Sequence, residues 1–377
     1  MYVNPYELSL DKTPANYQPL TPIVLLERAA KVYPDHIAII HGQRRTSYRE
    51  FYTRSRQLAS GLASRYIGKG DTVSVMLANT PSMLEAHYGV PMTGAVLHSI
   101  NTRLDAAIIA FQLDHANTKI LITDREFSPT IKEALTLCKV RPQVIDYNDT
   151  EFPQTGERLS NIDYEWFLQG GDPNFAWRMP DDEWDAIALN YTSGTTGNPK
   201  GVVYHHRGAT LMCYADIVAT GMGQHPVYLW TLPMFHCNGW CFPWALSAVV
   251  GTHVCLRWVR AKAMFDAIAD HKVTHLSGAP IVMSTLLNAA EAEKRKIGHR
   301  VSFNHAAAPP PEPVLAAMIE AGFQLTHLYG LTETYGPAVV NEWQAAWNSL
   351  PADQITAKRA RQGVRYAALE EIGRAHD

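Results

Sequence analysis

The chain has 377 residues, of which 46% are hydrophobic and 18% charged, a composition typical of a soluble globular enzyme and unlike that of a disordered chain. Its 33 basic and 36 acidic residues give a net charge of -3, without a run of Lys or Arg that could follow a nucleic-acid backbone. At about 150 residues per domain, this length predicts two or three folded units, and no nucleic acid is expected as a partner.

Cysteine usage and the N-terminal composition indicate where the chain works. The five cysteines are an odd number without disulfide-framework spacing, which favours a reducing compartment. His236, Cys237 and Cys241 lie close in sequence, but no second Cys/His pair completes a tetrahedral zinc site. Polar residues interrupt positions 1–20, and no apolar run reaches the roughly 18 residues of a spanning helix. We therefore expect a cytoplasmic protein that is neither exported nor membrane-spanning.

Strands and helices alternate along the first half of the chain. A helix is predicted to begin at Ser47, because Glu50 three residues later completes a capping-box pattern. Its apolar face carries Phe51, and its charged residues, Arg54 among them, are interpreted as a solvated face. The other helices are predicted at residues 81–97 and 129–137, and apolar runs predict strands at residues 37–40, 72–77, 119–123, 144–145 and 186–189.

The second half resumes this alternation after a long connection at residues 148–184, which has one short predicted helix at 164–168. Strands are predicted at residues 202–204, 227–232, 252–256, 273–276, 301–305 and 323–328. Helices are predicted between them, at residues 209–219, 240–250, 261–270, 281–290 and 312–320.

This pattern indicates an α/β fold with two mostly parallel sheets that carry helices on their faces. A boundary is expected near residue 220, which gives a first α/β unit at 1–220 and a second at 221–345. Residues 346–377 are interpreted as the incomplete start of a third unit, with a helical tail at 367–377.

A loop rich in glycine and hydroxyl residues follows the predicted strand at 186–189. From Asn190 it reads Asn-Tyr-Thr-Ser-Gly-Thr-Thr-Gly-Asn-Pro-Lys-Gly. Free backbone N–H groups in such a loop can surround an anion, and Lys200 adds the positive charge that a phosphate needs. It differs from the common nucleotide P-loop, in which Lys follows Gly and precedes Ser or Thr. We therefore predict a polyphosphate site, and a flexible solvated loop is the alternative. The site would be formed by Thr192, Ser193, Gly194, Thr195, Thr196, Gly197 and Lys200.

A second constellation follows the predicted strand at 323–328, where the chain reads Tyr-Gly-Leu-Thr-Glu. Open α/β sheets bind ligands just beyond the carboxyl ends of their strands. Tyr329 offers a flat face to a base, Thr332 a hydroxyl to a phosphate, and Glu333 an oxygen ligand to Mg²⁺. A helix N-cap followed by an acidic first turn is the alternative interpretation.

These two motifs together resemble those of adenylate-forming enzymes, which include acyl-CoA synthetases, luciferases and the adenylation domains of peptide synthetases. The resemblance covers residues 20–366 and is closest to bacterial short- and medium-chain acyl-CoA synthetases, enzymes of fatty acid and lipid metabolism. It implies the large N-terminal domain of these enzymes and a reaction in which a carboxylic acid and ATP form acyl-AMP and pyrophosphate, before the acyl group passes to coenzyme A. The residues implied as catalytic are Thr192, Lys200, His236, Thr332 and Glu333, with Thr192 and Glu333 on Mg²⁺.

The same resemblance implies binding sites for the adenine and for the acid. The adenine site would be formed by Ala307, Ala308, Pro309, His327, Leu328, Tyr329 and Gly330, where alanines replace family glycines and are expected to admit the ligand at ordinary backbone angles. The run Leu-Pro-Met-Phe-His from residue 232 resembles the family segment that lines the carboxylate pocket. The acid site would then contain His236, Asn238, Gly239, Trp240, Gly278 and Ala279, although ordinary aromatic core is the alternative for the residues after Trp240.

Members of this family continue with a Thr-Gly-Asp segment whose Asp holds the ribose, a hinge, and a C-terminal domain that carries a catalytic Lys. None of these occurs in the 377 residues, so the chain is expected to bind ATP but to adenylate slowly. Two alternatives stay open: an acyl- or aryl-AMP ligase that delivers to a carrier protein, and a nucleotide- or acyl-binding module with little turnover. The sequence also leaves a homodimer open.

Overall fold

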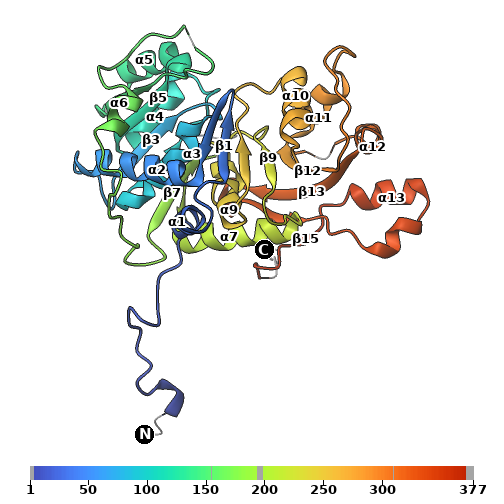
Figure 1. The fold of residues 1–377 in the computed structure, drawn as a ribbon, viewed down its shortest axis with the longest axis horizontal. Helices are drawn as coiled ribbons and strands as arrows, with labels where there is room; N and C mark the ends of the chain where they lie inside the picture. The colour runs from blue at the N-terminus through green and yellow to red at the C-terminus, as the bar shows by residue number, and fades with distance from the viewer. Residues whose placement is uncertain (1–3, 154, 193–197, 309, 371–377) are drawn as a thin grey trace.

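The computed structural model describes residues 4–153, 155–192, 198–308 and 310–370, which form two sheets covered by helices (Figure 1). The smaller sheet has six strands in the order β6-β5-β3-β4-β7-β8 and is parallel except for the antiparallel pair β7-β8. These strands are β3 (Thr72–Met76), β4 (Val96–Ser99), β5 (Thr118–Asp124), β6 (Gln143–Tyr147), β7 (Ala186–Tyr191) and β8 (Gly201–His205). The predicted α/β fold with two mostly parallel sheets is confirmed.

The larger sheet has nine strands in the order β15-β14-β13-β12-β11-β9-β10-β1-β2. Its interior from β1 to β13 is parallel, whereas β2, β14 and β15 add antiparallel edges. The strands are β1 (Ile37–His41), β2 (Arg44–Ser47), β9 (Val227–Leu229), β10 (Thr252–Val254), β11 (His275–Gly278), β12 (Val301–His305), β13 (Phe323–Leu331), β14 (Gly336–Val340) and β15 (Val364–Arg365). Because β1 and β2 belong to this sheet, the predicted boundary near residue 220 does not separate the two sheets, and the division into domains stays a prediction.

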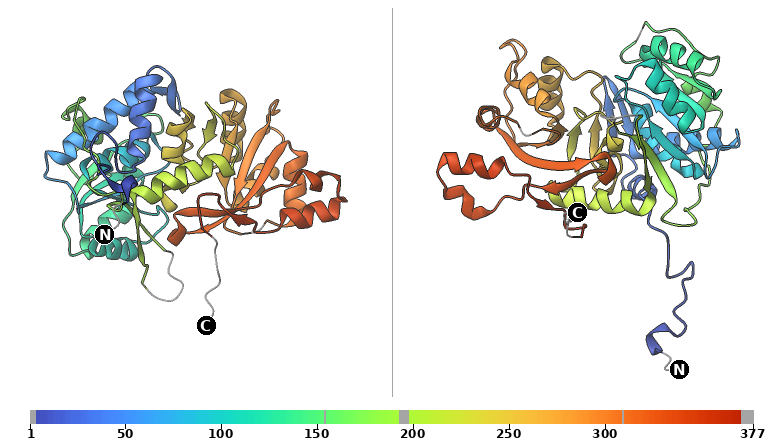
Figure 2. Two further views of the ribbon diagram at one scale, coloured as in Figure 1. Left: turned by 90° about the horizontal axis from the view of Figure 1, so that it is seen from below. Right: turned by 180° about the vertical axis from the view of Figure 1, so that it is seen from behind.

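Helices fill the space between the sheets and cover both outer faces. Helices α4 (Ala106–His115) and α5 (Ser128–Leu137) pack on the outer face of the smaller sheet. Helices α10 (Ala261–His271), α11 (Pro280–Leu287) and α12 (Glu312–Glu320) cover the outer face of the larger one. The largest apolar core lies between the sheets and includes α1 (Ile23–Val32), α2 (Tyr48–Ala63), α3 (Pro81–Gly89), α6 (Tyr164–Gln169), α7 (His206–Ala219) and α9 (Phe242–Ala248). Figure 2 shows α7, in yellow-green, between the part of the molecule that contains the smaller sheet and the part that contains the larger sheet.

Strand β4 contradicts the C-terminal part of the predicted helix at residues 81–97, and helix α4 was not predicted. The helix ends at Gly89, and Pro91 and the left-handed Gly94 (φ 84°) turn the chain into the fully paired strand β4. A parallel strand that is buried on both faces lacks the apolar-polar alternation of a half-buried strand, so periodicity did not reveal it. The loop after β4 leads to Asp105, whose carboxylate caps α4 by accepting from the Ile108 N–H at 2.9 Å.

Helix α2 begins as predicted, but one of its charged residues does not face solvent. The Ser47 hydroxyl accepts a hydrogen bond from the Glu50 N–H at 3.2 Å, so the predicted N-cap is confirmed. Arg54, predicted on a solvated face, is only 13% exposed in its side chain and pairs with Glu85 at 2.5 Å and with Glu165 at 2.7 Å. The correction follows from Glu85, which is fully buried on α3 and needs a cationic partner there.

A buried charge cluster connects the two sheets. The Arg257 guanidinium, which follows β10 in the larger sheet, lies 2.8 Å from Asp124 at the end of β5 and 2.9 Å from Asp149 after β6. It also lies 2.6 Å from Glu126, and His41 at the end of β1 pairs with Asp149 at 2.9 Å. Removing one member of such a cluster leaves an uncompensated buried charge, which costs about 3 to 5 kcal/mol. The cluster therefore fixes how the carboxyl ends of strands from both sheets meet.

Three further observations bear on the sequence predictions. All five cysteines are free thiols. Among the residues that the structure describes, no helix is long and apolar enough to cross a membrane. Helix α13 (Ala352–Arg359) was not predicted, whereas residues 367–370 of the predicted helical tail are not helical and residues 371–377 lie outside the described ranges.

We predict that the free energy of unfolding falls as the pH drops below about 6.5. Burial lowers the pKa from 6.5 to about 3 or 4 in six histidines: His87, His98, His206, His253, His275 and His305. The unfolded chain therefore binds more protons than the folded chain between these values, so acid favours unfolding. Asp124, Asp146 and Asp216, whose pKa values burial raises, oppose this effect. The midpoint of urea unfolding should fall from pH 7 to pH 5.5.

The variant His253→Asn tests whether the buried histidines cause this pH dependence. The Trp230 indole N–H donates a hydrogen bond to His253, and the asparagine side-chain oxygen can still accept it. The variant should reduce the pH dependence, whereas His115→Asn at an exposed position should not. A midpoint that stays constant over this pH range would contradict the prediction.

Candidate active site

Two adjoining cavities lie at the carboxyl ends of strands from both sheets, where open α/β sheets bind ligands. The small cavity, of about 170 Å³, is lined by residues near the ends of β4 and β7, including Ser99, Asn190 and Thr192. The large cavity, of about 490 Å³, is bordered by residues that end or follow β11, β12 and β13, including Ala279, Ala306, Ala307 and Gly330. Both are lined by His236, Cys237 and Thr332, so the two cavities adjoin each other at these residues.

The ends of the predicted phosphate loop are held by the hairpin of β7 and β8. The Thr192 N–H donates to the Lys200 carbonyl at 3.0 Å, and the Lys200 N–H donates to the Thr192 hydroxyl at 3.2 Å. Thr192 lines the small cavity, whereas Lys200 is exposed and lines neither cavity. The central residues Ser193, Gly194, Thr195, Thr196 and Gly197 lie outside the described residues.

Thr332 connects this hairpin to the Tyr-Gly-Leu-Thr-Glu segment. Its carbonyl accepts from the Tyr204 hydroxyl on β8 at 2.5 Å, and the Tyr204 ring stacks on Tyr335 at 3.6 Å. The short 3-10 helix η4 (Thr332–Thr334) holds Thr332 against both cavities. Glu333 follows it, is exposed and lines neither cavity.

The alanine turn after β12 is strained, contrary to expectation. Ala307 has φ 83°, in the left-handed region, and not the ordinary backbone angle that the sequence predicted. Ala307 lines the large cavity and Ala308 is exposed beside it, whereas Pro309 lies outside the described residues. A turn that brings backbone close to a ligand favours glycine at this position, which is the residue type expected from the resemblance.

The strand that carries Tyr329 presents only part of the predicted adenine site. Tyr329 is 41% exposed, and Gly330 lines the large cavity. Because side chains alternate along a strand, Leu328 points the other way and is fully buried in the core between the sheets. His327 stacks on His305 at 4.8 Å and borders a different cavity. Neither side chain therefore faces the large cavity, and the binding of a cofactor by His327 and Leu328 stays a prediction.

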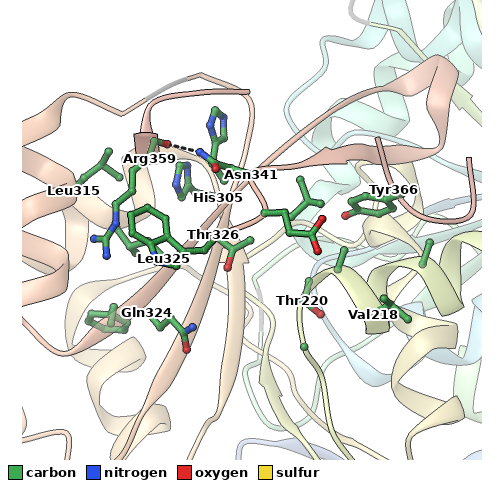
Figure 3. Close-up of a pocket in the computed structure, with 18 of the residues that line it drawn as sticks. Val218, Thr220, His305, Leu315, Gln324, Leu325, Thr326, Asn341, Arg359 and Tyr366 are labelled. Carbon is green, nitrogen blue, oxygen red and sulfur yellow. Dashed lines mark hydrogen bonds between the residues drawn. The ribbon is translucent and has the colours of Figure 1, made fainter. Parts of the chain in front are cut away.

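That other cavity, of about 690 Å³, lies beside the end of α7 (Figure 3). Its lining comes from α7 and the loop after it (Val218, Thr220), from β12 and β13 (His305, Thr326) and from α13 (Arg359). The Arg359 carbonyl accepts a hydrogen bond from the Asn341 amide at 3.0 Å. Among the predicted site residues that the structure describes, His327 alone lines this cavity. It is therefore not the candidate active site.

The segment after β9 forms the wall of the large cavity. His236 lines both cavities, and its pKa is lowered because the surrounding protein desolvates the imidazolium and Arg103 repels it. Trp240 also lines the large cavity. Asn238 and Gly239 are buried behind this wall and line neither cavity, and their contact with the acid stays a prediction.

The second wall of the large cavity follows β11. Ala279 lines it, together with Ile281 and Val282 from α11. Gly278, also predicted at the acid site, does not line it. A Cβ at Gly278 would lie 2.8 Å from the Val282 side chain, so its small size serves the packing of α11 against β11.

Sequence reasoning missed several residues of the site, among them Ser99, Arg103 and Asn190. Ser99 ends β4, and Arg103 lies in the loop that follows it. Had the buried run at residues 96–99 been interpreted as a parallel strand, its carboxyl end would have indicated both. Asn190 lies within the quoted loop motif, but nothing in the pattern distinguished its side chain from those of its neighbours.

We predict that Ala307→Gly stabilises the fold by about 1 kcal/mol, because glycine adopts a positive φ without the steric cost that alanine has. The matched control is Ala308→Gly, which removes the same methyl group at the next residue, where φ is not positive. Chemical unfolding should show a higher free energy of unfolding for the first variant and an equal or lower one for the second. Equal destabilisation by both would show that no strain is stored at Ala307.

Comparisons with known proteins identify a family and solved structures of similar fold. A family model described as AMP-binding enzyme matches residues 26–365. The peroxisomal acetate/butyrate–CoA ligase AAE7 of Arabidopsis thaliana is 47% identical over 96% of this chain, which spans 66% of that protein's length. The inhibitor-bound N-terminal domain of FACL13 from Mycobacterium tuberculosis is similar in structure, with a TM-score of 0.79 and 22% identity over 92% of this chain and 83% of that one. The O-succinylbenzoate–CoA synthetase MenE of Bacillus subtilis, solved with ATP and a magnesium ion, has a TM-score of 0.71 and 24% identity, with 91% and 65% coverage.

Proposed function

This chain belongs to the AMP-binding enzyme family, and we propose that it provides the ATP- and acid-binding part of an acyl-CoA synthetase. One observation carries this proposal: the small cavity at Thr192, where the Gly/Ser/Thr loop begins, adjoins a larger and mostly apolar cavity at Thr332 and His236. A cavity beside the phosphate loop next to an apolar one suits a nucleotide joined to an acyl group. The similarity to a ligase of acetate and butyrate favours a short- or medium-chain carboxylic acid as the substrate.

The proposed reaction has two steps. A carboxylate oxygen of the acid forms a bond to the α-phosphorus of ATP, and the bond from that phosphorus to the bridging oxygen breaks, which releases pyrophosphate. The thiol of coenzyme A, losing its proton, then bonds to the acyl carbonyl carbon, and AMP leaves. Thr332 and the ends of the loop would hold the phosphates, and His236 would lie beside the carboxylate.

The donor groups near the phosphate end fit magnesium, because hydroxyl and carboxylate oxygens are its preferred protein ligands. Thr192 and Glu333 would hold it, and it would offset the negative charge that develops as pyrophosphate leaves. Lys200, which lies in the hairpin with Thr192, would pair with the β- and γ-phosphates. Desolvation and Arg103 lower the pKa of His236 and so favour its neutral ring, which would donate one hydrogen bond without adding a charge beside the acid.

A pyrophosphate-release assay with a panel of acids, run with and without coenzyme A, tests the proposal. Release of pyrophosphate together with formation of acyl-CoA supports it. Accumulation of acyl-AMP that coenzyme A does not consume would indicate a ligase that delivers to a carrier protein. Binding of ATP without pyrophosphate release would indicate a binding module. Slow adenylation, a cytoplasmic location and a homodimer stay predictions.

We predict that Lys200→Ala weakens the binding of Mg-ATP by roughly 10- to 150-fold, since a charge-assisted phosphate contact contributes about 1.5 to 3 kcal/mol. Isothermal titration calorimetry measures this directly. The control Lys262→Ala removes an exposed ammonium that pairs with Asp266 on α10, and it should leave the affinity unchanged. An equal ATP affinity of the Lys200 variant and the unmodified chain would exclude the phosphate role.

We predict that Trp240→Ala shifts the preferred acid toward longer or bulkier chains, because removing an indole enlarges the large cavity. The ratio of kcat/KM for hexanoate over butyrate measures the shift. The matched control is Trp184→Ala, which removes an indole that is 67% exposed and lines neither cavity. If stability falls but the ratio is constant, Trp240 contributes only to packing.

A further inference from the structure

Five successive residues with positive φ follow His236 beside the two cavities. These values are 41° for Cys237, 43° for Asn238, 57° for Gly239, 54° for Trp240 and 60° for Cys241. They form a left-handed turn, α8 (Cys237–Trp240), that continues into Cys241. Each residue other than glycine costs about 1 to 2 kcal/mol in this conformation, so the turn persists only where its surroundings hold it.

Asn238 makes the side-chain contacts that hold the turn from inside. It is fully buried, and its amide Nδ2 donates to the Ser99 hydroxyl at 3.0 Å. The Asn190 side chain forms a hydrogen bond with the amide oxygen Oδ1 of Asn238. Ser99 ends β4 and Asn190 belongs to β7, so one side chain links the turn to two neighbouring strands of the smaller sheet.

The turn packs closely against the interior at Gly239. A Cβ placed on Gly239 would lie 2.9 Å from the Trp230 ring, which is fully buried. The Cys241 N–H donates back to the Asn238 carbonyl at 3.2 Å, which closes the turn on itself. The position of the turn therefore depends on the Asn238 amide on one side and on the Trp230 indole on the other.

Both ends of this turn reach the candidate active site. His236 precedes it and lines both cavities, and Trp240 within it lines the large cavity. Asn190 is two residues before Thr192 on the strand that leads into the phosphate loop. The amide of Asn238 thus lies between the strand that ends at the phosphates and the wall that faces the acyl group.

We propose that Asn238 is a positioning residue, which holds the left-handed turn so that His236 and Trp240 fit the acyl group of the acyl-AMP. This inference rests on the proposed function of the same site. An amide suits the position because it donates to Ser99 and pairs with Asn190 without bringing a charge into the interior. Asparagine also tolerates the left-handed conformation better than most residues.

The test compares two ligands by calorimetry: AMP, and butyryl-sulfamoyl-adenosine, a stable mimic of a short-chain acyl-AMP. The main variant is Asn238→Gly, since glycine adopts the left-handed angles and keeps the chain folded while the amide contacts are lost. We expect its affinity for the butyryl mimic to fall at least about fivefold, as for a lost buried hydrogen bond, and its affinity for AMP to change less than about twofold.

Two further variants isolate the amide contact. Ser99→Ala removes one partner of Asn238 and should have a smaller effect in the same direction, and its combination with Asn238→Gly should be less than additive. Asn341→Ala is the matched control, because it deletes an amide that bonds backbone carbonyls near α13, outside both cavities, and should change neither affinity.

The outcomes separate this inference from the function on which it rests. If the unmodified chain binds the butyryl mimic no better than AMP, the proposed function fails and the inference with it. If the unmodified chain prefers the mimic but Asn238→Gly keeps that preference, or weakens both ligands equally, Asn238 is only a structural residue and the inference alone is wrong.

Discussion

The buried cluster around Arg257 is the constraint on which the site depends. Its guanidinium comes from the larger sheet, while two of its carboxylates, on Asp124 and Asp149, follow strands of the smaller one. Each group alone would be too costly to bury, so the sheets must meet where the charges pair. Burial raises the pKa of Asp124, whereas His41 and Arg257 outweigh the same desolvation at Asp149 and lower its pKa. The two sheets thereby present their carboxyl ends to a common space.

The candidate active site uses contributions from both sheets across that space. The smaller sheet supplies the loop hairpin and the hydroxyl of Ser99, and the larger sheet supplies the alanine turn and Gly330. Contacts between the two parts, such as the one from Tyr204 to the Thr332 carbonyl, close the arrangement. Backbone strain is concentrated here, at Ala307 and in the turn from Cys237 to Cys241, as is common where a ligand is held closely.

Much of this arrangement could be predicted from the sequence, because its signals are local. Gly/Ser/Thr spacing indicated the loop, and apolar periodicity indicated most strands and helices, with α2 starting at its Ser47 cap. What failed depends on distant contacts. A strand such as β4, buried on both faces, has no periodic signature, and Arg54 looks solvated until Glu85 is found beside it. The side chain of Asn238 points away from the cavity that its neighbours line, and no local pattern records that direction.

The place of β1 in the larger sheet has a consequence for how the chain is made on the ribosome. This strand pairs with β10, which leaves the ribosome roughly 200 residues later, or about 10 to 40 s at ordinary rates of synthesis. Until then, β1 and β2 form a hairpin without the rest of the sheet to which they belong, and a two-stranded hairpin has only marginal stability in water. Their unpaired edge is open to other chains during that interval. Slow translation up to β10 therefore prolongs the interval in which the chain can aggregate. Chaperones that shield nascent N-terminal segments would act on the hairpin of β1 and β2 during this interval.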